Sequence, residues 1–238
     1  RHIQARWPGA ELVATDLSPD MLARTAKGAF VAGTFLTMDG EAPPFEGEWF
    51  DLILSNLAFQ WFDNLAEALE RLTRLLRPGG SVIFSTMGEG SFARWRQAHE
   101  KCGHVAGVPV YPDLAKLRTI LARYEDAFAF DEEYLLSSGS ARGLVRHLKG
   151  IGAVVPSEGR QPLAPKDLRQ VMAAFDEAGG HDIFQPLLGT LTRLRDNADD
   201  KRDIVFNAYD PNMYWGVSEN DRTHLFNFHY VYELPFWK

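Results

Sequence analysis

Residues 51–87 read DLILSNLAFQWFDNLAEALERLTRLLRPGGSVIFSTM and contain the clearest structural signal in this chain. They begin with a short apolar run that predicts a buried strand, and a second such run follows at 81–87. Between the two runs, leucines at helical spacing predict an amphipathic helix over about 64–77, with Asn64 and Glu67 resembling a capping box at its start. The Pro-Gly-Gly after Arg77 should end this helix. This is the pattern of one βαβ unit of a parallel sheet. Ligands of such sheets bind at the carboxyl ends of the strands, so the segment predicts a site as well as a fold.

The residues before this unit repeat the pattern. Residues 11–17 predict a strand that ends in Asp16, and Ser18 is a plausible N-cap for a helix after it. Residues 30–37 predict another strand, and a loop marked by Gly and Pro leads to the strand at 51–55. The alternation predicts an α/β fold with a mostly parallel sheet and right-handed crossovers.

After residue 87 the regular alternation of strands and helices stops. We expect the remaining elements to be helices at 91–101, 113–124, 140–153 and from about 166, with a strand near 126–137. Ser140 is the expected N-cap of the helix at 140–153. A charged, linker-like stretch covers 195–203, and the aromatic-rich end includes the alternating run THLFNFHYVYE at 223–233.

The composition of the chain argues against several classes of function. The chain has 238 residues, 45% apolar and 24% charged, which is ordinary for a globular protein. A net charge of −7 argues against a general nucleic-acid binder, and no apolar run is long enough to span a bilayer. The single cysteine fits a reducing cytoplasm, and the histidines show no metal-ligand spacing, so we expect no metal. No nucleophile elbow or P-loop is present, and the residues predict no oligomeric state.

Polar residues stand where the predicted strands end. Asp16 has the chemistry to accept hydrogen bonds from a ribose diol, although a helix-cap role is equally compatible with its position. Asp39, in the loop after the next strand, is either a ligand-facing carboxylate or a solvated turn residue. Asn56 offers a donor and an acceptor, or closes an Asx turn, while Gln60 and Trp61 wall a pocket or belong to the core.

A basic stripe lies farther along the chain. Arg142, Arg146 and Lys149 have spacings of four and three, so they share one face of the predicted helix. Such a stripe suits an anionic ligand, but it is more often a solvated face.

The segments ELVATDLSPDML, GEAPPFEGEWFDLILSNLAFQW and LLRPGG together resemble a class I S-adenosylmethionine-dependent methyltransferase. More narrowly, SNLAFQW, FSTMGEGSF and RHLKGIGA resemble the malonyl-acyl-carrier-protein O-methyltransferases of biotin synthesis, over about residues 1–180. The resemblance implies a Rossmann-like fold with a seven-stranded sheet and a last strand soon after the helix near 168–178. It implies methyl transfer from S-adenosylmethionine to the free carboxylate of a malonyl thioester carried by acyl-carrier protein or coenzyme A.

The resemblance also assigns roles. Asp16, with Leu17 beside it, would bind the ribose of the cofactor, Asp39 would meet its adenine, and Asn56 would border the methyl-donor pocket. On the acceptor side, Arg146 is the best candidate to hold the malonyl carboxylate, and Lys149 is the weaker one. Gln60 and Trp61 are kept as candidate substrate-binding residues, and Arg94, Arg96 and Lys101 as a docking patch for an acidic carrier protein.

Two features depart from the family. Its first strand and Gly-rich loop would lie upstream of Arg1, so we expect a sheet that lacks the strand between 11–17 and 51–55. We therefore expect a methyltransferase domain over 1–194, with an acceptor-side insertion at about 88–150, and an extension over 195–238. The final alternating strand would replace the family's last strand, cover an exposed edge or belong to a partner surface. Two alternatives stay open: a class I methyltransferase with another small acceptor, or a truncated relative that does not catalyse.

Overall fold

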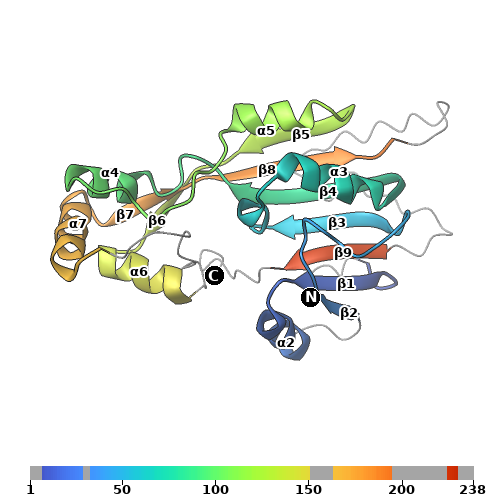
Figure 1. Ribbon diagram of the computed structural model, residues 1–238, viewed down its shortest axis with the longest axis horizontal. Coiled ribbons are helices and arrows are strands. Elements are labelled where there is room, and N and C mark those ends of the chain that lie inside the picture. The colour runs from blue at the N-terminus through green and yellow to red at the C-terminus, as the bar shows by residue number, and fades with distance from the viewer. Residues whose placement is uncertain (1–6, 29–32, 151–162, 195–223, 230–238) are drawn as a thin grey trace. The chain divides into compact units, whose positions relative to one another are not determined.

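The computed structural model describes residues 7–28, 33–150, 163–194 and 224–229, with the backbone alone at 149–150 and 224–229 (Figure 1). Its strands are β1 (Glu11–Asp16), β2 (Thr34–Thr37), β3 (Phe50–Asn56), β4 (Leu76–Met87), β5 (Asp126–Asp131), β6 (Tyr134–Ser137), β7 (His181–Phe184), β8 (Pro186–Thr192) and β9 (His224–His229). Its helices are α2 (Pro19–Gly28), α3 (Leu65–Arg74), α4 (Ala93–Lys101), α5 (Leu114–Leu121), α6 (Ala141–Gly150) and α7 (Pro165–Glu177), with a 3₁₀ turn, η1 (Phe59–Trp61).

The strands form a seven-stranded sheet in the order β2-β1-β9-β3-β4-β8-β5 and a two-stranded sheet of β6 and β7. This confirms the α/β class that the sequence predicts. Among the described helices, none is long and apolar enough to cross a membrane.

The chain divides into two compact units. The first contains Arg1–Phe84, Ala122–Ala127 and Thr190–Val231, and the second contains Ser85–Leu121, Phe128–Gly189 and Tyr232–Lys238. The division falls inside β4, β5 and β8, and each unit is described by itself below. The domain boundary expected at 194/195 stays a prediction.

The centre of the sheet differs from expectation. β9 lies between β1 and β3 and pairs with both in parallel, which Figure 1 shows as the red strand beside the blue ones. It therefore occupies the position that was expected to be empty, and it covers the strand edges that the missing family strand would leave exposed, which is one of the three places considered for it. The physical reason is that two neighbouring parallel strands with unpaired edges need a partner for their backbone groups.

Helix α3 forms where the sequence predicts it, and its stripe of Ala68, Leu69 and Leu72 is fully buried. The expected cap is confirmed, because Asn64 Oδ1 accepts a hydrogen bond from Glu67 N at 3.3 Å and Asn64 Nδ2 donates to Glu67 Oε1 at 2.8 Å. In a capping box the Glu side chain would also accept from the cap's own N–H.

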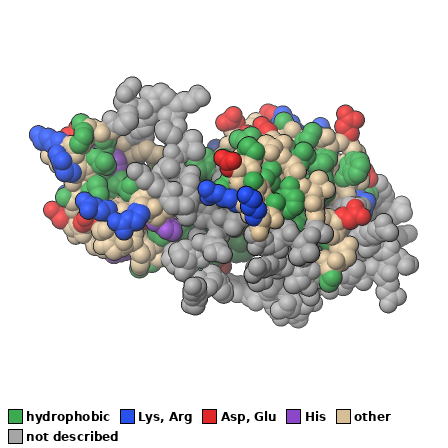
Figure 2. All heavy atoms as spheres, turned by 90° about the horizontal axis from the view of Figure 1, so that it is seen from below, with side chains coloured by type: hydrophobic (Ala, Val, Ile, Leu, Met, Phe, Trp, Pro, Cys, Tyr) green, Lys and Arg blue, Asp and Glu red, His purple; other side chains and the backbone are tan. Residues whose placement is uncertain are grey.

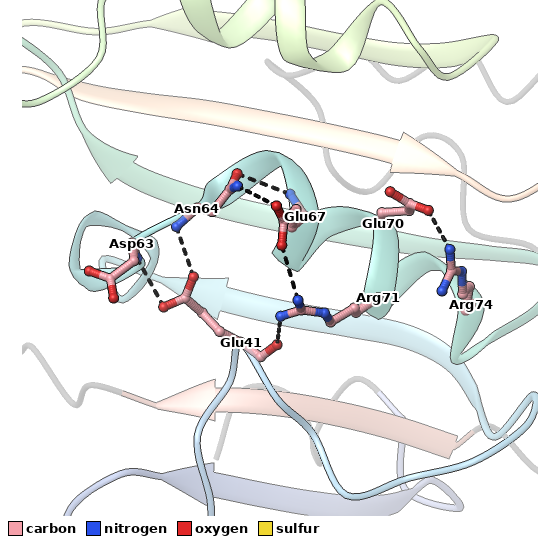
Figure 3. Close-up of polar contacts among 7 residues, drawn as sticks. All are labelled: Glu41, Asp63, Asn64, Glu67, Glu70, Arg71 and Arg74. Atoms are coloured by element: carbon pink, nitrogen blue, oxygen red, sulfur yellow. Dashed lines mark hydrogen bonds and ion pairs between the residues drawn. The ribbon is translucent and has the colours of Figure 1, made fainter.

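Glu41 accepts from that N–H instead (Figure 3). Its carboxylate accepts hydrogen bonds from the backbone N–H groups of Asp63 and Asn64, both at 2.9 Å. Arg71 Nη1 donates to the Glu41 carbonyl at 2.7 Å, and its Nη2 lies 3.1 Å from Glu67 Oε2. The loop after β2 is thereby fixed to the start of α3.

The Arg-Pro-Gly-Gly sequence does not end the helix as expected. The helix already ends at Arg74, and these four residues belong to β4. The residue before a proline avoids helical backbone, which favours this earlier end. Gly80 also has little room, because an added Cβ would lie 3.0 Å from the Phe50 carbonyl oxygen. Gly79 N donates to the Arg193 carbonyl at 2.8 Å, so the segment is bound into the sheet.

The predicted strand at 126–137 is in fact two strands, β5 and β6, in different sheets. β6 pairs antiparallel with β7, whereas β5 neighbours β8. Gln185 alone separates β7 from β8, so the partner strands pass from one sheet to the other at this residue. Two strands, β7 and β8, follow α7 at the place where the resemblance implies a last strand. Hydrogen bonds of Gly79 with Arg193 and of Gly88 with Gln185 make β8 antiparallel to β4.

Candidate functional site

The carboxyl ends of β1, β9 and β3 lie side by side at one edge of the sheet. Asp16 is in register with Thr37 of β2, and Asn56 is in register with His229 of β9. Neighbouring strands are about 4.8 Å apart, so β1 and β3 lie about 10 Å apart across β9. The structure therefore brings the strand ends that carry Asp16 and Asn56 to one edge of the first unit.

Four buried side-chain oxygens of the described residues have no hydrogen-bond partner: Thr15 Oγ1, Asp16 Oδ2, Ser55 Oγ and Gln60 Oε1. All four belong to this edge, at the ends of β1 and β3 or in the turn after β3. Buried polar groups are normally hydrogen-bonded, because an unpaired one costs roughly 1–3 kcal/mol. Their position together at one edge of the sheet indicates a surface where the polar atoms of a ligand would complete the hydrogen bonding.

Asp16 is the one of these four residues whose unpaired oxygen belongs to a carboxyl group. Its side chain is buried, and only Oδ1 is used, accepting a hydrogen bond from Ser18 N at 2.7 Å. Burial raises the pKa of this carboxyl above its ordinary value, while the Ser18 N–H acts in the opposite direction. Ser18 Oγ in turn accepts from Met21 N at 3.4 Å, as expected for the cap of α2. The free Oδ2 can accept from a hydroxyl donor such as a ribose.

The two other expected cofactor residues near Asp16 are exposed. Leu17 has 69% of its surface exposed, directly after the buried carboxylate. Asp39 is exposed as well, and its Oδ1 accepts a hydrogen bond from Glu41 N at 2.9 Å. Met38 N donates to the Asp16 carbonyl at 3.1 Å, which fixes this loop next to the end of β1. Both side chains are available to a ligand at this edge.

The end of β3 is shaped by a strained turn. Leu57 has a φ of 52°, in the left-handed region that side chains other than Gly seldom adopt. Gln60 Nε2 donates to the Leu57 carbonyl, which secures the turn, and Gln60 Oε1 remains buried without a partner. Asn56 is exposed and Trp61 is half-buried. Backbone strain of this kind concentrates at ligand sites, which fits the predicted roles of these residues without testing them.

The acceptor candidates belong to the second unit. Arg146 and Arg142 are exposed on α6, whereas the side chain of Lys149 lies outside the described residues. Ser140 caps the helix as predicted, with Ser140 Oγ accepting from Gly143 N at 3.1 Å. Ala141 N donates to Asp176 Oδ1 at 2.6 Å, so α6 is anchored to α7.

The expected docking patch is only partly available. The Arg96 guanidinium donates to the carbonyls of Glu89, Ser91 and Pro109 and holds the surrounding loops. Lys101 is exposed and pairs with Glu177 at 3.5 Å, on the rim of a groove of about 580 Å³ between α4 and α7. Figure 2 shows Lys and Arg side chains on the surface of this unit (at the left), with Asp and Glu side chains among them.

One candidate residue, Thr15, was not predicted as a site residue. It precedes Asp16 on β1, and its hydroxyl oxygen is buried and unpaired, like that of Ser55 before Asn56 on β3. The one available signal is a hydroxyl residue directly before a polar strand end. Among the described residues, no group of His, Cys, Asp and Glu is arranged to hold a metal.

Comparison with known proteins identifies the family. Residues 2–84 match the model of a methyltransferase domain. The chain is 38% identical to the biotin biosynthesis bifunctional protein BioCD of Bordetella avium, over 82% of this chain and 41% of that protein. It is 32% identical to the malonyl-[acyl-carrier protein] O-methyltransferase of Magnetococcus marinus, over 83% of this chain and 74% of that protein.

A solved structure agrees on the fold. BH2331 from Bacillus halodurans C-125, a protein assigned as a methyltransferase, superposes with a TM-score of 0.52 at 14% identity, over 81% of this chain and 87% of that one. The sequence identity to the Magnetococcus protein extends over most of both chains and shows the family as well as the fold. This chain belongs to the malonyl-[acyl-carrier protein] O-methyltransferase family.

Proposed function

We propose that this protein transfers a methyl group from S-adenosylmethionine to the free carboxylate of a malonyl thioester, as the names of its relatives describe. The observation that carries the proposal is the buried Asp16 carboxylate with one unpaired oxygen. A neutral or cationic ligand with hydroxyl donors satisfies it, whereas an anionic ligand such as a phosphate does not. The ribose of an adenosyl cofactor has two such hydroxyls.

The residues present fit this cofactor. Asp16 would bind the ribose hydroxyls, Leu17 would contact the adenine ring, and Asp39 would accept from its amino group. Asn56 and Gln60 would supply polar atoms near the reacting end. When bound, S-adenosylmethionine supplies an electrophilic methyl group on a sulfonium centre.

The acceptor needs orientation rather than activation. A malonyl carboxylate is ionised at neutral pH, so an oxygen lone pair forms the new C–O bond as the C–S bond breaks, and no proton moves. This chemistry needs no general base, and rate enhancement comes from alignment and from exclusion of water. Arg146 would hold the carboxylate by charge-assisted hydrogen bonds, with Lys149 as a second cation and Trp61 as an apolar wall.

The carrier is acyl-carrier protein or coenzyme A. An acidic carrier protein would meet the exposed Lys101 and the half-buried Arg94, which also donates to the Ala178 carbonyl at 3.4 Å. Arg96 instead holds its own loops. Because the single cysteine fits a reducing compartment, the proposal includes a cytoplasmic location.

The test is methyl transfer to malonyl-CoA and to malonyl acyl-carrier protein, compared with methyl transfer to a phenol and a quinol. We expect activity on the malonyl thioesters alone. Arg146→Ala should raise KM for the acceptor and lower kcat, with a combined loss of roughly tenfold or more, while the affinity for S-adenosylhomocysteine is unchanged.

Arg169→Ala is the matched control, since Arg169 is an exposed arginine on α7 of the same unit. It should behave as wild type. Loss of cofactor binding in Arg146→Ala would remove that residue from the acceptor site. Activity on the phenol but not on malonyl thioesters would replace the substrate assignment, and no binding of S-adenosylhomocysteine to the wild-type chain would overturn the enzyme assignment.

A further inference from the structure

The C-terminal strand β9 lies inside the candidate cofactor site. Residues 224–228 are in register with Glu11–Thr15 of β1, and residues 225–229 are in register with Leu52–Asn56 of β3. In the described sheet order, β1 and β3 are joined only through β9. The two strand ends that carry the candidate ligands therefore depend on β9 for their spacing.

The register places β9 among the unpaired oxygens. Phe228 is the partner of both Thr15 and Ser55, whose hydroxyl oxygens are buried without partners. The next residue, His229, is the partner of Asn56, and Asp16 directly follows Thr15 on the other side. The last two positions of β9 thus lie between the two halves of the site.

Release of β9 would be costly for both neighbours. It would leave the backbone N–H and C=O groups that face it on β1 and β3 without partners in the middle of the sheet. The two halves could then no longer keep the distance of about 10 Å at which one adenosyl group contacts both. A site that needs both halves would be lost at the same time.

We propose that β9 is a positioning element of the cofactor site, and that cofactor binding and the seating of β9 between β1 and β3 are thermodynamically coupled. The proposal rests on the proposed function for the identity of the ligand. If the state in which β9 is released does not bind the cofactor, bound cofactor lowers the population of that state by the factor 1 + [ligand]/Kd. By reciprocity, pairing of β9 with β1 and β3 raises the affinity for the cofactor.

Hydrogen exchange of the full chain tests the coupling. With S-adenosylhomocysteine at 100 times its Kd, the amides of residues 224–229 should exchange about 100-fold more slowly than without it. The amides of α7, in the second unit, are the internal reference and should slow by much less. Equal slowing of β9 and α7, or no slowing of β9, would overturn the coupling.

A proline variant supplies the reverse test. Asn227→Pro removes a backbone N–H in the middle of β9 and should weaken S-adenosylhomocysteine binding by at least about tenfold. Asn220→Pro, at an asparagine that precedes β9 in the sequence, is the matched control and should bind as wild type. Unchanged affinity in Asn227→Pro would overturn the proposal while leaving the proposed function in place.

Cross-linking tests the placement of β9 without any ligand. In a Cys102→Ser background, Val13→Cys with Phe226→Cys joins two residues in register, whereas Val13→Cys with Leu225→Cys is one position off and on opposite faces. Only the first pair should form a disulfide within one chain. A failure to cross-link, or a cross-link between two chains, would overturn the assignment of β9 to its own sheet. Absence of S-adenosylhomocysteine binding in wild type would instead overturn the proposed function and the coupling together.

Discussion

Two buried aspartates in this protein have opposite surroundings. Asp182, in the second unit, is fully buried, and its two carboxylate oxygens accept three backbone hydrogen bonds at 2.8–3.0 Å, from the N–H groups of Arg94, Trp95 and Ile183. Asp16, in the first unit, is nearly as buried but accepts one hydrogen bond, and its second oxygen has no partner. Burial raises the pKa of both carboxyls.

The difference separates a structural carboxylate from one that serves a ligand. Asp182 caps the first turn of α4 and joins it to β7, so its charge is fully used by the fold. The buried Asp16 charge lowers the stability of the cofactor-free protein, as is common for groups that act only when a ligand is bound. Burial and a raised pKa alone would not distinguish the two; the count of hydrogen-bond partners does.

The largest effect on stability should come from Asp182→Ala. The variant leaves three backbone donors without their carboxylate, so the free energy of unfolding should fall by roughly 3 kcal/mol or more. Urea unfolding followed by circular dichroism measures this change. Asp126→Ala, at an exposed position, is the control and should stay within about 0.5 kcal/mol of wild type. A small effect of Asp182→Ala would contradict the structural role assigned to the Asp182 carboxylate.

Two buried serines repeat the contrast on a smaller scale. Ser91 Oγ donates to the Gln185 carbonyl at 3.1 Å and accepts from Gln185 N at 3.0 Å, whereas Ser55 Oγ has no partner. Ser91→Ala should therefore cost roughly 1–2 kcal/mol, and Ser55→Ala should change the stability of the cofactor-free protein by less than about 0.5 kcal/mol. The same unfolding experiment compares them. Equal losses would mean that the Ser55 hydroxyl already has a structural partner.

The smallest effect concerns Asp16→Asn in the cofactor-free protein. Because the folded-state pKa of Asp16 lies above its ordinary value of 3.8, wild type loses stability as pH rises from 3.8 through that folded pKa. The asparagine variant does not pay this electrostatic cost, so its Tm should be higher by roughly 2 °C at pH 7, with the gain vanishing below pH 3.8. Differential scanning calorimetry across pH measures it. A lower Tm for the variant at pH 7 would show that the Asp16 charge stabilises the fold.

Local features of the sequence predicted much of the fold and part of the site. The helix after Asn64 and the cap at Ser140 depend on residues within four positions, and both were confirmed. The strand ends at Asp16 and Asn56 came from the same kind of local pattern.

The remaining features depend on distant partners. Alternation in residues 223–233 predicts a strand but cannot say that it inserts between β1 and β3, because the pairing joins residues more than 150 positions apart. Arg77 and the Pro-Gly-Gly after it predict a helix end, whereas backbone hydrogen bonds with Arg193 place that segment in a sheet. Thr15 looks like an ordinary strand residue until the absence of a hydrogen-bond partner for its hydroxyl oxygen is known.

Cofactor binding through Asp16 is tested most directly by a cycle of two proteins and two ligands. Wild type and Asp16→Ala are each titrated calorimetrically with S-adenosylhomocysteine and with its 2′,3′-dideoxyribose analogue. Loss of the hydroxyls should weaken binding to wild type by roughly tenfold or more and binding to the variant hardly at all, because the hydroxyls then have no carboxylate to meet. If both proteins lose affinity by the same factor, Asp16 does not bind the ribose.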